Sequence, residues 1–102
     1  MKLNYDAREL GKFCRDHGIS RLELFGSALR EDFRSDSDLD LLATLRPDAR
    51  PTLFDWAEMQ EELAKFFGRP VDLVSRRAIE RSKNPYRREP ILSTATPIYV
   101  EG

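Results

Sequence analysis

The 102-residue sequence has few of the residues on which several classes of protein depend. One cysteine, Cys14, excludes an intrachain disulfide and a multi-cysteine zinc site, and it favours a reducing compartment. It lies on an apolar stripe and is expected in the core. The single histidine, His17, lies at an expected helix end and is a poor candidate for a metal or triad role. Five glycines, at positions 11, 18, 26, 68 and 102, leave neither a P-loop nor a dinucleotide-binding fingerprint.

The chain also lacks a large net charge and a long apolar run. Its 17 basic and 18 acidic residues give a net charge of -1, so no direct nucleic-acid partner is expected. The absence of a signal peptide or membrane-spanning stretch predicts a cytoplasmic protein with no membrane partner. The 40% of hydrophobic residues suffice for one modest core, which predicts a single domain over residues 1–102.

Two stretches have the three- to four-residue apolar period of amphipathic helices. The first is expected to be capped by Asn4, to reach about His17 and to stop at Gly18. The second follows Thr52, where an acid three residues later completes a capping-box pattern. Its apolar stripe is the largest in the chain and marks the core helix. The stripe consists of Leu53, Trp56, Met59, Leu63, Phe66 and Phe67.

Four short stretches have the alternation or apolar composition of strands. They are residues 21–25, 38–45, 71–74 and 98–100, with a further short helix expected over 86–94. Strands that alternate with amphipathic helices predict a two-layer α/β domain. We expect a small mixed sheet with helices packed on one face.

Asp38 and Asp40 are the strongest candidates for a functional site. Because side chains alternate along a strand, both carboxylates project from one face, while Leu39 and Leu41 enter the other. Like charges this close are unfavourable unless a cation is present, and Mg²⁺ binds one or two carboxylates together with water and phosphates. Taken alone, such a pair is more often a polar turn at the entry to a strand.

Two further features strengthen this candidate. Gly26 and Ser27 end the preceding strand, where a glycine lets backbone amides approach a phosphate and a serine adds a hydroxyl. Asp72 lies in an otherwise apolar strand and would join the two acids if that strand neighbours theirs. A simple turn and the solvent side of an edge strand are the alternatives for these residues.

The stretch LFGSALREDFRSDSDLDLL, with Gly-Ser, ten residues and then Asp-x-Asp, resembles the signature of polymerase-β-like nucleotidyltransferases. More closely it resembles their minimal nucleotidyltransferase branch, the MntA-type antitoxins that pair with HEPN-domain toxins. The resemblance extends to VDLV and NPYRREPIL and covers most of the chain. It implies a polymerase-β-like fold.

By this resemblance Asp38 and Asp40 hold two Mg²⁺ ions on ATP, and Asp72 completes the catalytic and metal site. Gly26 and Ser27 match phosphate-binding residues, and Arg30 stands where a basic side chain follows. Two metal ions can activate an attacking hydroxyl and stabilise the leaving pyrophosphate, and Asp72 can accept the proton. The chain departs from its relatives at positions 31 and 32, where Glu and Asp add negative charge beside the phosphate site.

A chain of 102 residues has no room for a second domain that presents an acceptor, so another protein is the natural source of the hydroxyl. The resemblance implies an antitoxin that transfers AMP from ATP to a tyrosine of a HEPN ribonuclease. One alternative is a binding module that neutralises its partner by contact. Another is transfer to a small-molecule hydroxyl, which would proceed without a protein partner.

The stretch 76–88 contains six basic residues and one acid, Glu80. The basic residues are Arg76, Arg77, Arg81, Lys83, Arg87 and Arg88. Such runs are often solvated faces. A partner surface and a cradle for the triphosphate are the functional alternatives, whereas a groove for RNA is less supported because only Tyr86 can stack on bases.

Overall fold

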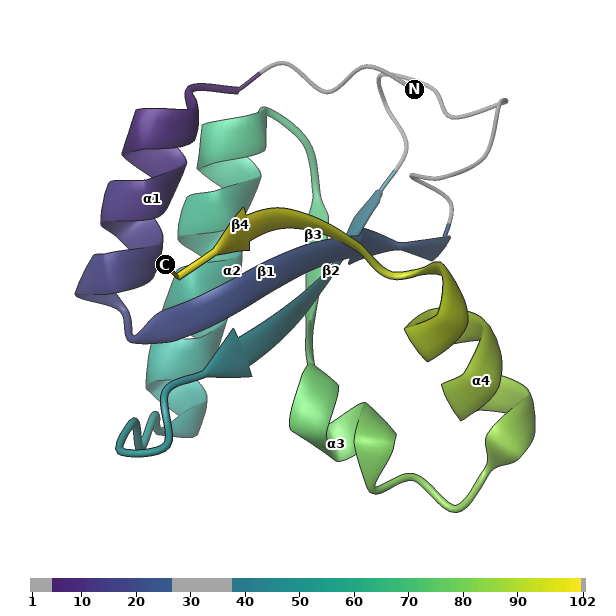
Figure 1. Cartoon of the computed structure of the whole chain (residues 1–102). Coiled ribbons are helices and arrows are strands. Elements are labelled where there is room, and N and C mark those ends of the chain that lie inside the picture. The colour runs from purple at the N-terminus through teal and green to yellow at the C-terminus, as the bar shows by residue number, and fades with distance from the viewer. Residues whose placement is uncertain (1–4, 27–37, 102) are drawn as a thin grey trace.

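The computed structural model describes residues 5–26 and 38–101 and contains a four-stranded sheet with four helices in those residues (Figure 1). The elements are α1 (Ala7–Asp16), β1 (Ile19–Phe25), β2 (Leu39–Leu45), α2 (Leu53–Phe67), β3 (Val71–Ser75), α3 (Arg76–Glu80), α4 (Pro85–Thr94) and β4 (Thr96–Val100). The strand order is β3-β2-β1-β4. Strands β2 and β3 are parallel, and β1 pairs antiparallel with β2 and with β4. The sheet is therefore mixed, and the predicted α/β class is confirmed.

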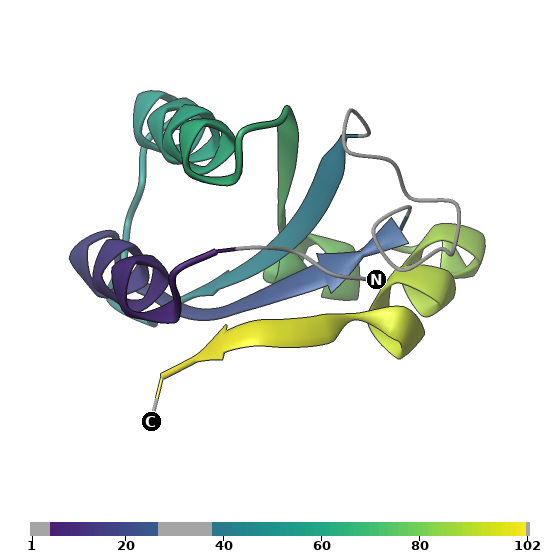
Figure 2. The same cartoon turned by 90° about the horizontal axis from the view of Figure 1, so that it is seen from above.

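Helices α1 and α2 lie on one face of the sheet, and the short helices α3 and α4 lie on the other side (Figure 2). The expectation that helices pack on one face therefore holds for α1 and α2 but not for the helix predicted over 86–94. The main core lies between α1, α2 and the sheet. Its buried members are Leu10, Cys14, Ile19, Leu22, Leu24, Leu39, Leu41, Ala43, Met59, Leu63, Val71 and Leu73. A second, smaller cluster joins Phe25, Leu42 and Ile79 on the opposite face. The two central strands therefore contribute buried apolar side chains to both faces of the sheet.

The N-cap of helix α1 lies two residues later than predicted. Asp6 is the N-cap, and its carboxylate accepts hydrogen bonds from the backbone N–H groups of Arg8 at 2.9 Å and Glu9 at 3.3 Å. The prediction of Asn4, which lies outside the described residues, is therefore wrong. Gly18 follows the helix with φ of +72°, a conformation that favours glycine, and the chain turns there into β1.

The predicted capping box of α2 is confirmed. The Thr52 hydroxyl accepts from the Asp55 N–H, and the Asp55 carboxylate accepts from the Thr52 N–H. Met59 and Leu63 are buried as expected, but Leu53 is 89% exposed. The apolar stripe therefore starts one turn before the part of the helix that packs on the sheet.

Side chains of α2 also close the outer edge of β3. The Trp56 indole donates to the carbonyl of Leu73 at 2.9 Å, and the N–H of Leu73 donates to the Gln60 side chain at 2.9 Å. An unpaired strand edge invites pairing with another chain, and these two bonds satisfy one residue of that edge. They also fix β3, and with it Asp72, against the core helix.

None of the helices in residues 5–26 and 38–101 is long and apolar enough to cross a bilayer.

Candidate active site

Asp40 and Asp72 are direct neighbours across two parallel strands. They are Cα partners in the ladder between β2 and β3, so the expectation that the strand of Asp72 adjoins that of Asp40 is confirmed. Neighbouring strands lie about 4.8 Å apart, and partner residues project from the same face. Asp40 is half-buried and Asp72 is exposed. The register thus places two carboxylates side by side at one end of the sheet.

Asp38 directly precedes β2 and is exposed. It stands two positions before Asp40, and strand alternation gives both residues the same side of the sheet. Leu39 and Leu41 point the other way and are fully buried in the main core. The predicted alternation is therefore confirmed, because burial of the two leucines fixes the side of the strand from which Asp38 and Asp40 project.

Gly26 lies against the Asp40 carboxylate. It follows Phe25, the last residue of β1, which is the Cα partner of Asp40. Its φ is +69°, and a Cβ on Gly26 would come within 2.5 Å of Oδ2 of Asp40. Both its backbone conformation and its lack of a side chain are therefore required where the two strands meet. The Gly26–Asp40 contact joins the two parts of the predicted motif.

Two other predicted site residues, Ser27 and Arg30, lie outside the described residues, as do the two acids at positions 31 and 32. The roles given to them above remain predictions.

The described residues contain no group of three or more His, Cys, Asp or Glu side chains arranged to hold a metal ion. A magnesium site needs fewer protein ligands, because Mg²⁺ usually takes one or two carboxylates and completes its shell with water and substrate phosphates. Asp38 and Asp40 provide hard oxygen donors of this kind, and Gly26 leaves open the space next to one of them. The donor chemistry fits a magnesium ion that is shared with a nucleotide.

The sequence interpretation missed a buried ion pair on the same face of the sheet. Glu23 in β1 is 1% exposed, and its carboxylate accepts a hydrogen bond from Arg76 Nη1 at 2.7 Å. Arg76 also donates to Glu80 at 3.2 Å, and Arg21 Nε lies 3.4 Å from Glu23. The alternation of charged and apolar residues in β1 was the available signal, but it does not reveal that both faces are covered.

These contacts hold the charged side chain of Arg76 in one position. Burial by itself would lower the pKa of its guanidinium, but hydrogen bonds to Glu23 and then Glu80 outweigh this effect and raise the pKa. Arg76 is the first residue of α3, so the pair attaches that helix to the centre of the sheet. One of the six residues in the basic stretch is therefore structural.

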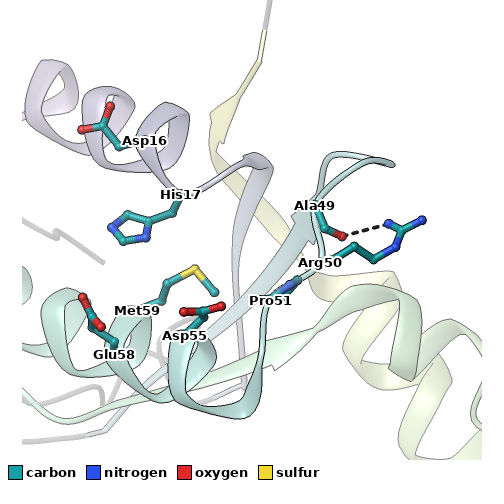
Figure 3. Close-up of a pocket in the computed structure, with 8 residues that line it drawn as sticks. All are labelled: Asp16, His17, Ala49, Arg50, Pro51, Asp55, Glu58 and Met59. Carbon is teal, nitrogen blue, oxygen red and sulfur yellow. Dashed lines mark hydrogen bonds between the residues drawn. The ribbon is translucent and has the colours of Figure 1, made fainter.

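A separate pocket lies between the end of α1 and the start of α2 (Figure 3). It has a volume of about 270 Å³. Its lining is Asp16, His17, Ala49, Arg50, Pro51, Asp55, Glu58 and Met59. None of the predicted site residues belongs to it. It lies on the α1 and α2 side of the sheet, whereas Asp40 and Asp72 project from the other face, so the acids rather than this pocket define the candidate site.

His17 and Cys14 have structural surroundings, as the sequence suggested. The His17 ring packs on Phe13 with centroids 4.3 Å apart, and Nε2 lies 3.1 Å from Glu62. Cys14 is fully buried, and burial raises the pKa of its thiol to about 12. A thiol that stays protonated at neutral pH is a poor nucleophile.

Residues 7–96 match the model of the nucleotidyltransferase domain. The chain belongs to this family. The nucleotidyltransferase is 32% identical to the protein adenylyltransferase MntA of Thermococcus cleftensis over 63 residues. This aligned region covers 62% of each of the two chains. It is similar, at 36% identity and a TM-score of 0.67, to a solved structure assigned provisionally as a minimal nucleotidyltransferase, over 90% of this chain and 88% of the other. The predicted family and its polymerase-β-like fold are thus confirmed, and a nucleotide is its substrate.

The fold is also similar to that of one chain in a solved toxin–antitoxin complex. The complex contains a tri-AMPylated HEPN toxin of Shewanella oneidensis and an MNT antitoxin. The TM-score is 0.60 at 20% identity, over 92% of this chain and 69% of the other. At this identity the likeness concerns the fold of the nucleotidyltransferase.

Proposed function

We propose that this nucleotidyltransferase is a magnesium-dependent protein adenylyltransferase that transfers AMP from ATP to a tyrosine hydroxyl of a HEPN-domain partner, and so acts as its antitoxin. The observation that carries the proposal is the register that pairs Asp40 with Asp72, with Asp38 and Gly26 at the same end of the sheet. The names of the relatives, a protein adenylyltransferase and an antitoxin bound to an AMPylated HEPN toxin, support this choice of reaction and partner.

Asp38 and Asp40 are the proposed metal ligands. Bound Mg²⁺ would neutralise the triphosphate and polarise the α-phosphate. Asp40 is fixed for this role by its place in a central strand and by Gly26, which leaves space for its carboxylate. Asp72, on the neighbouring strand, is the proposed base, and as a further carboxylate it also adds to the metal site.

The proposed reaction is an in-line displacement. The tyrosine oxygen forms a bond to the α-phosphorus, the bond from that phosphorus to the bridging oxygen breaks, and pyrophosphate leaves. Asp72 takes the hydroxyl proton. The proposed phosphate-binding residues are Gly26, Ser27 and Arg30. Gly26 lets backbone amides approach the phosphates, Ser27 adds a hydroxyl, and Arg30 adds a positive charge.

The acceptor is proposed to come from a second protein. The described sheet and helices place Asp38 and Asp72 at an exposed end of the molecule, where another chain can approach them. Positioning and charge neutralisation provide most of the catalysis in phosphoryl and nucleotidyl transfer, so docking the acceptor is as important as binding ATP.

The test is transfer of α-phosphate label from ATP, in the presence of Mg²⁺, to a HEPN-domain protein co-expressed with this chain. We expect label on wild type and none with Asp38→Ala combined with Asp40→Ala. Asp48→Ala, which removes an exposed aspartate outside the site, is the matched control and should retain labelling. A partner that stays bound and inactive without any label would overturn the catalytic proposal in favour of neutralisation by contact, and label on a small molecule alone would replace the protein acceptor.

A further inference from the structure

The six cations of the basic stretch separate into two groups. Arg76 is tied to Glu23 and Glu80, and Arg88 donates to the carbonyl of Ser82 at 3.1 Å and to Glu89. The remaining four are exposed, and none of them has an acidic partner among residues 5–26 and 38–101. These four are Arg77, Arg81, Lys83 and Arg87.

An exposed aromatic side chain lies in the same segment. Tyr86, in the first turn of α4, is 89% exposed. Tyrosine and arginine are the residue types most enriched among the side chains that dominate binding energy at protein interfaces. We call Arg77, Arg81, Lys83, Tyr86 and Arg87 the cationic surface.

The cationic surface is held by the fold before any partner binds. The Asn84 side chain accepts from the N–H of Tyr86 at 3.1 Å, and Pro85 fixes the backbone at the first position of α4. The Arg88 bond to Ser82 closes the connection between α3 and α4. The buried pair of Arg76 with Glu23 attaches the whole segment to the sheet. A preorganised surface loses less conformational entropy on binding.

The location of the cationic surface separates it from the catalytic acids. Asp72 is near the start of β3, whereas α3 begins after the end of that strand, and Figure 1 shows α3 at the far end of β3. Helix α4 has ten residues, about 15 Å, and leads back toward the sheet, where it is followed by β4. Strand β4 pairs with β1 close to Gly26. This arrangement favours a partner surface over a cradle for the triphosphate.

We propose that the cationic surface binds an acidic face of the protein that carries the acceptor hydroxyl, and that α4 spans the distance from this contact to the catalytic acids. The inference rests on the proposed function and adds to it the surface by which the acceptor protein is selected. Four cations that have no acidic partner in the part of the chain that the structure describes select for negative charge, and Tyr86 provides the central aromatic contact. A nucleic acid is disfavoured because the chain has a net charge of -1 and this surface has one aromatic side chain.

The test is Arg81→Glu combined with Arg87→Glu, measured with a HEPN-domain protein that accepts label from the wild-type chain. We expect KM for the protein acceptor to rise by on the order of 30-fold at low salt, with kcat and KM for ATP unchanged. High salt should reduce the difference, because it screens the lost attraction. The matched control is Lys12→Glu combined with Lys65→Glu, which makes the same charge change on α1 and α2, where both lysines are exposed.

A second measurement keeps the docking inference separate from the catalytic proposal. In chains that also carry Asp38→Ala and Asp40→Ala, partner binding should persist and should still weaken on reversal at Arg81 and Arg87. Binding that the reversal leaves unchanged would overturn the docking inference even if label transfer is seen. Loss of binding to a 20-nucleotide RNA, with partner affinity intact, would assign the surface to nucleic acid instead.

Discussion

Asp40 and Asp72 are Cα partners in adjacent parallel strands, and with Asp38 they place three carboxylates at one end of the sheet. Their arrangement follows from packing on the opposite face. Leu39, Leu41 and Leu73 are buried in the main core, and strand alternation then fixes the direction of the acids. A slip of one residue in β2 would bury the carboxylates and expose the leucines, so the energy of the core maintains the geometry of the site.

Asp40→Asn tests whether this arrangement serves a metal and nucleotide. Without ligand we expect the melting temperature to stay the same or rise, because the substitution relieves repulsion from neighbouring carboxylates. With Mg²⁺ and ATP at a hundred times Kd, wild type should gain about 2.7 kcal/mol, and the variant should gain almost nothing. Thermal melts with and without Mg²⁺ and ATP measure both effects. A large loss of stability in the ligand-free variant would instead show that Asp40 is structural.

Gly26→Ala tests the contact between Gly26 and the Asp40 carboxylate. A side chain costs about 1–2 kcal/mol at a positive φ, and here the added Cβ would also stand 2.5 Å from Oδ2 of Asp40. We expect reduced stability in chemical denaturation, together with loss of the Mg²⁺- and ATP-dependent gain.

Gly68→Ala is its matched control. Gly68 has φ of +70°, but nothing lies within 4 Å of the Cβ that would be added. Gly68→Ala should lose only the cost of the positive φ, about 1–2 kcal/mol, and should keep the response to Mg²⁺ and ATP. An equal ligand response in the two variants would show that the contact with Asp40 has no part in binding.

The sequence predicted the local features and missed those that depend on distant packing. The capping box of Thr52 and the alternation around Asp40 involve neighbours in the chain, and both were predicted correctly. Leu53 continues the apolar stripe of α2 but extends past the sheet, and the position of the sheet is not visible in a helical period. The burial of Glu23 depends on Arg76, 53 residues away, and on α3, which the sequence pattern did not indicate.

Arg76→Met tests the role of this distant pair in stability. The substitution leaves Glu23, which is 1% exposed, without its shortest hydrogen bond in a site from which water is excluded. Removing one partner of a buried pair costs about 3 kcal/mol or more, whereas replacing both with apolar groups of similar size can be neutral. We therefore expect Arg76→Met alone to be strongly destabilising and Arg76→Met with Glu23→Met to recover most of the loss in urea denaturation. Equal losses in the single and double variants would contradict this account.

Cys14 gives the chain a distinctive response to alkaline pH. Its thiol has an ordinary pKa of 9.0 when unfolded and about 12 in the folded protein, so between these values the folded state retains a proton that the unfolded state has lost. Stability contributed by this group is present below pH 9 and falls by up to about 1.4 kcal/mol per pH unit between pH 9 and 12. Cys14→Ala should remove that part of the slope, although the cavity will lower its stability at pH 7. Urea titrations of both proteins at several pH values above 8 measure the difference, and parallel curves would show that the thiol ionises as readily in the folded core as in the unfolded chain.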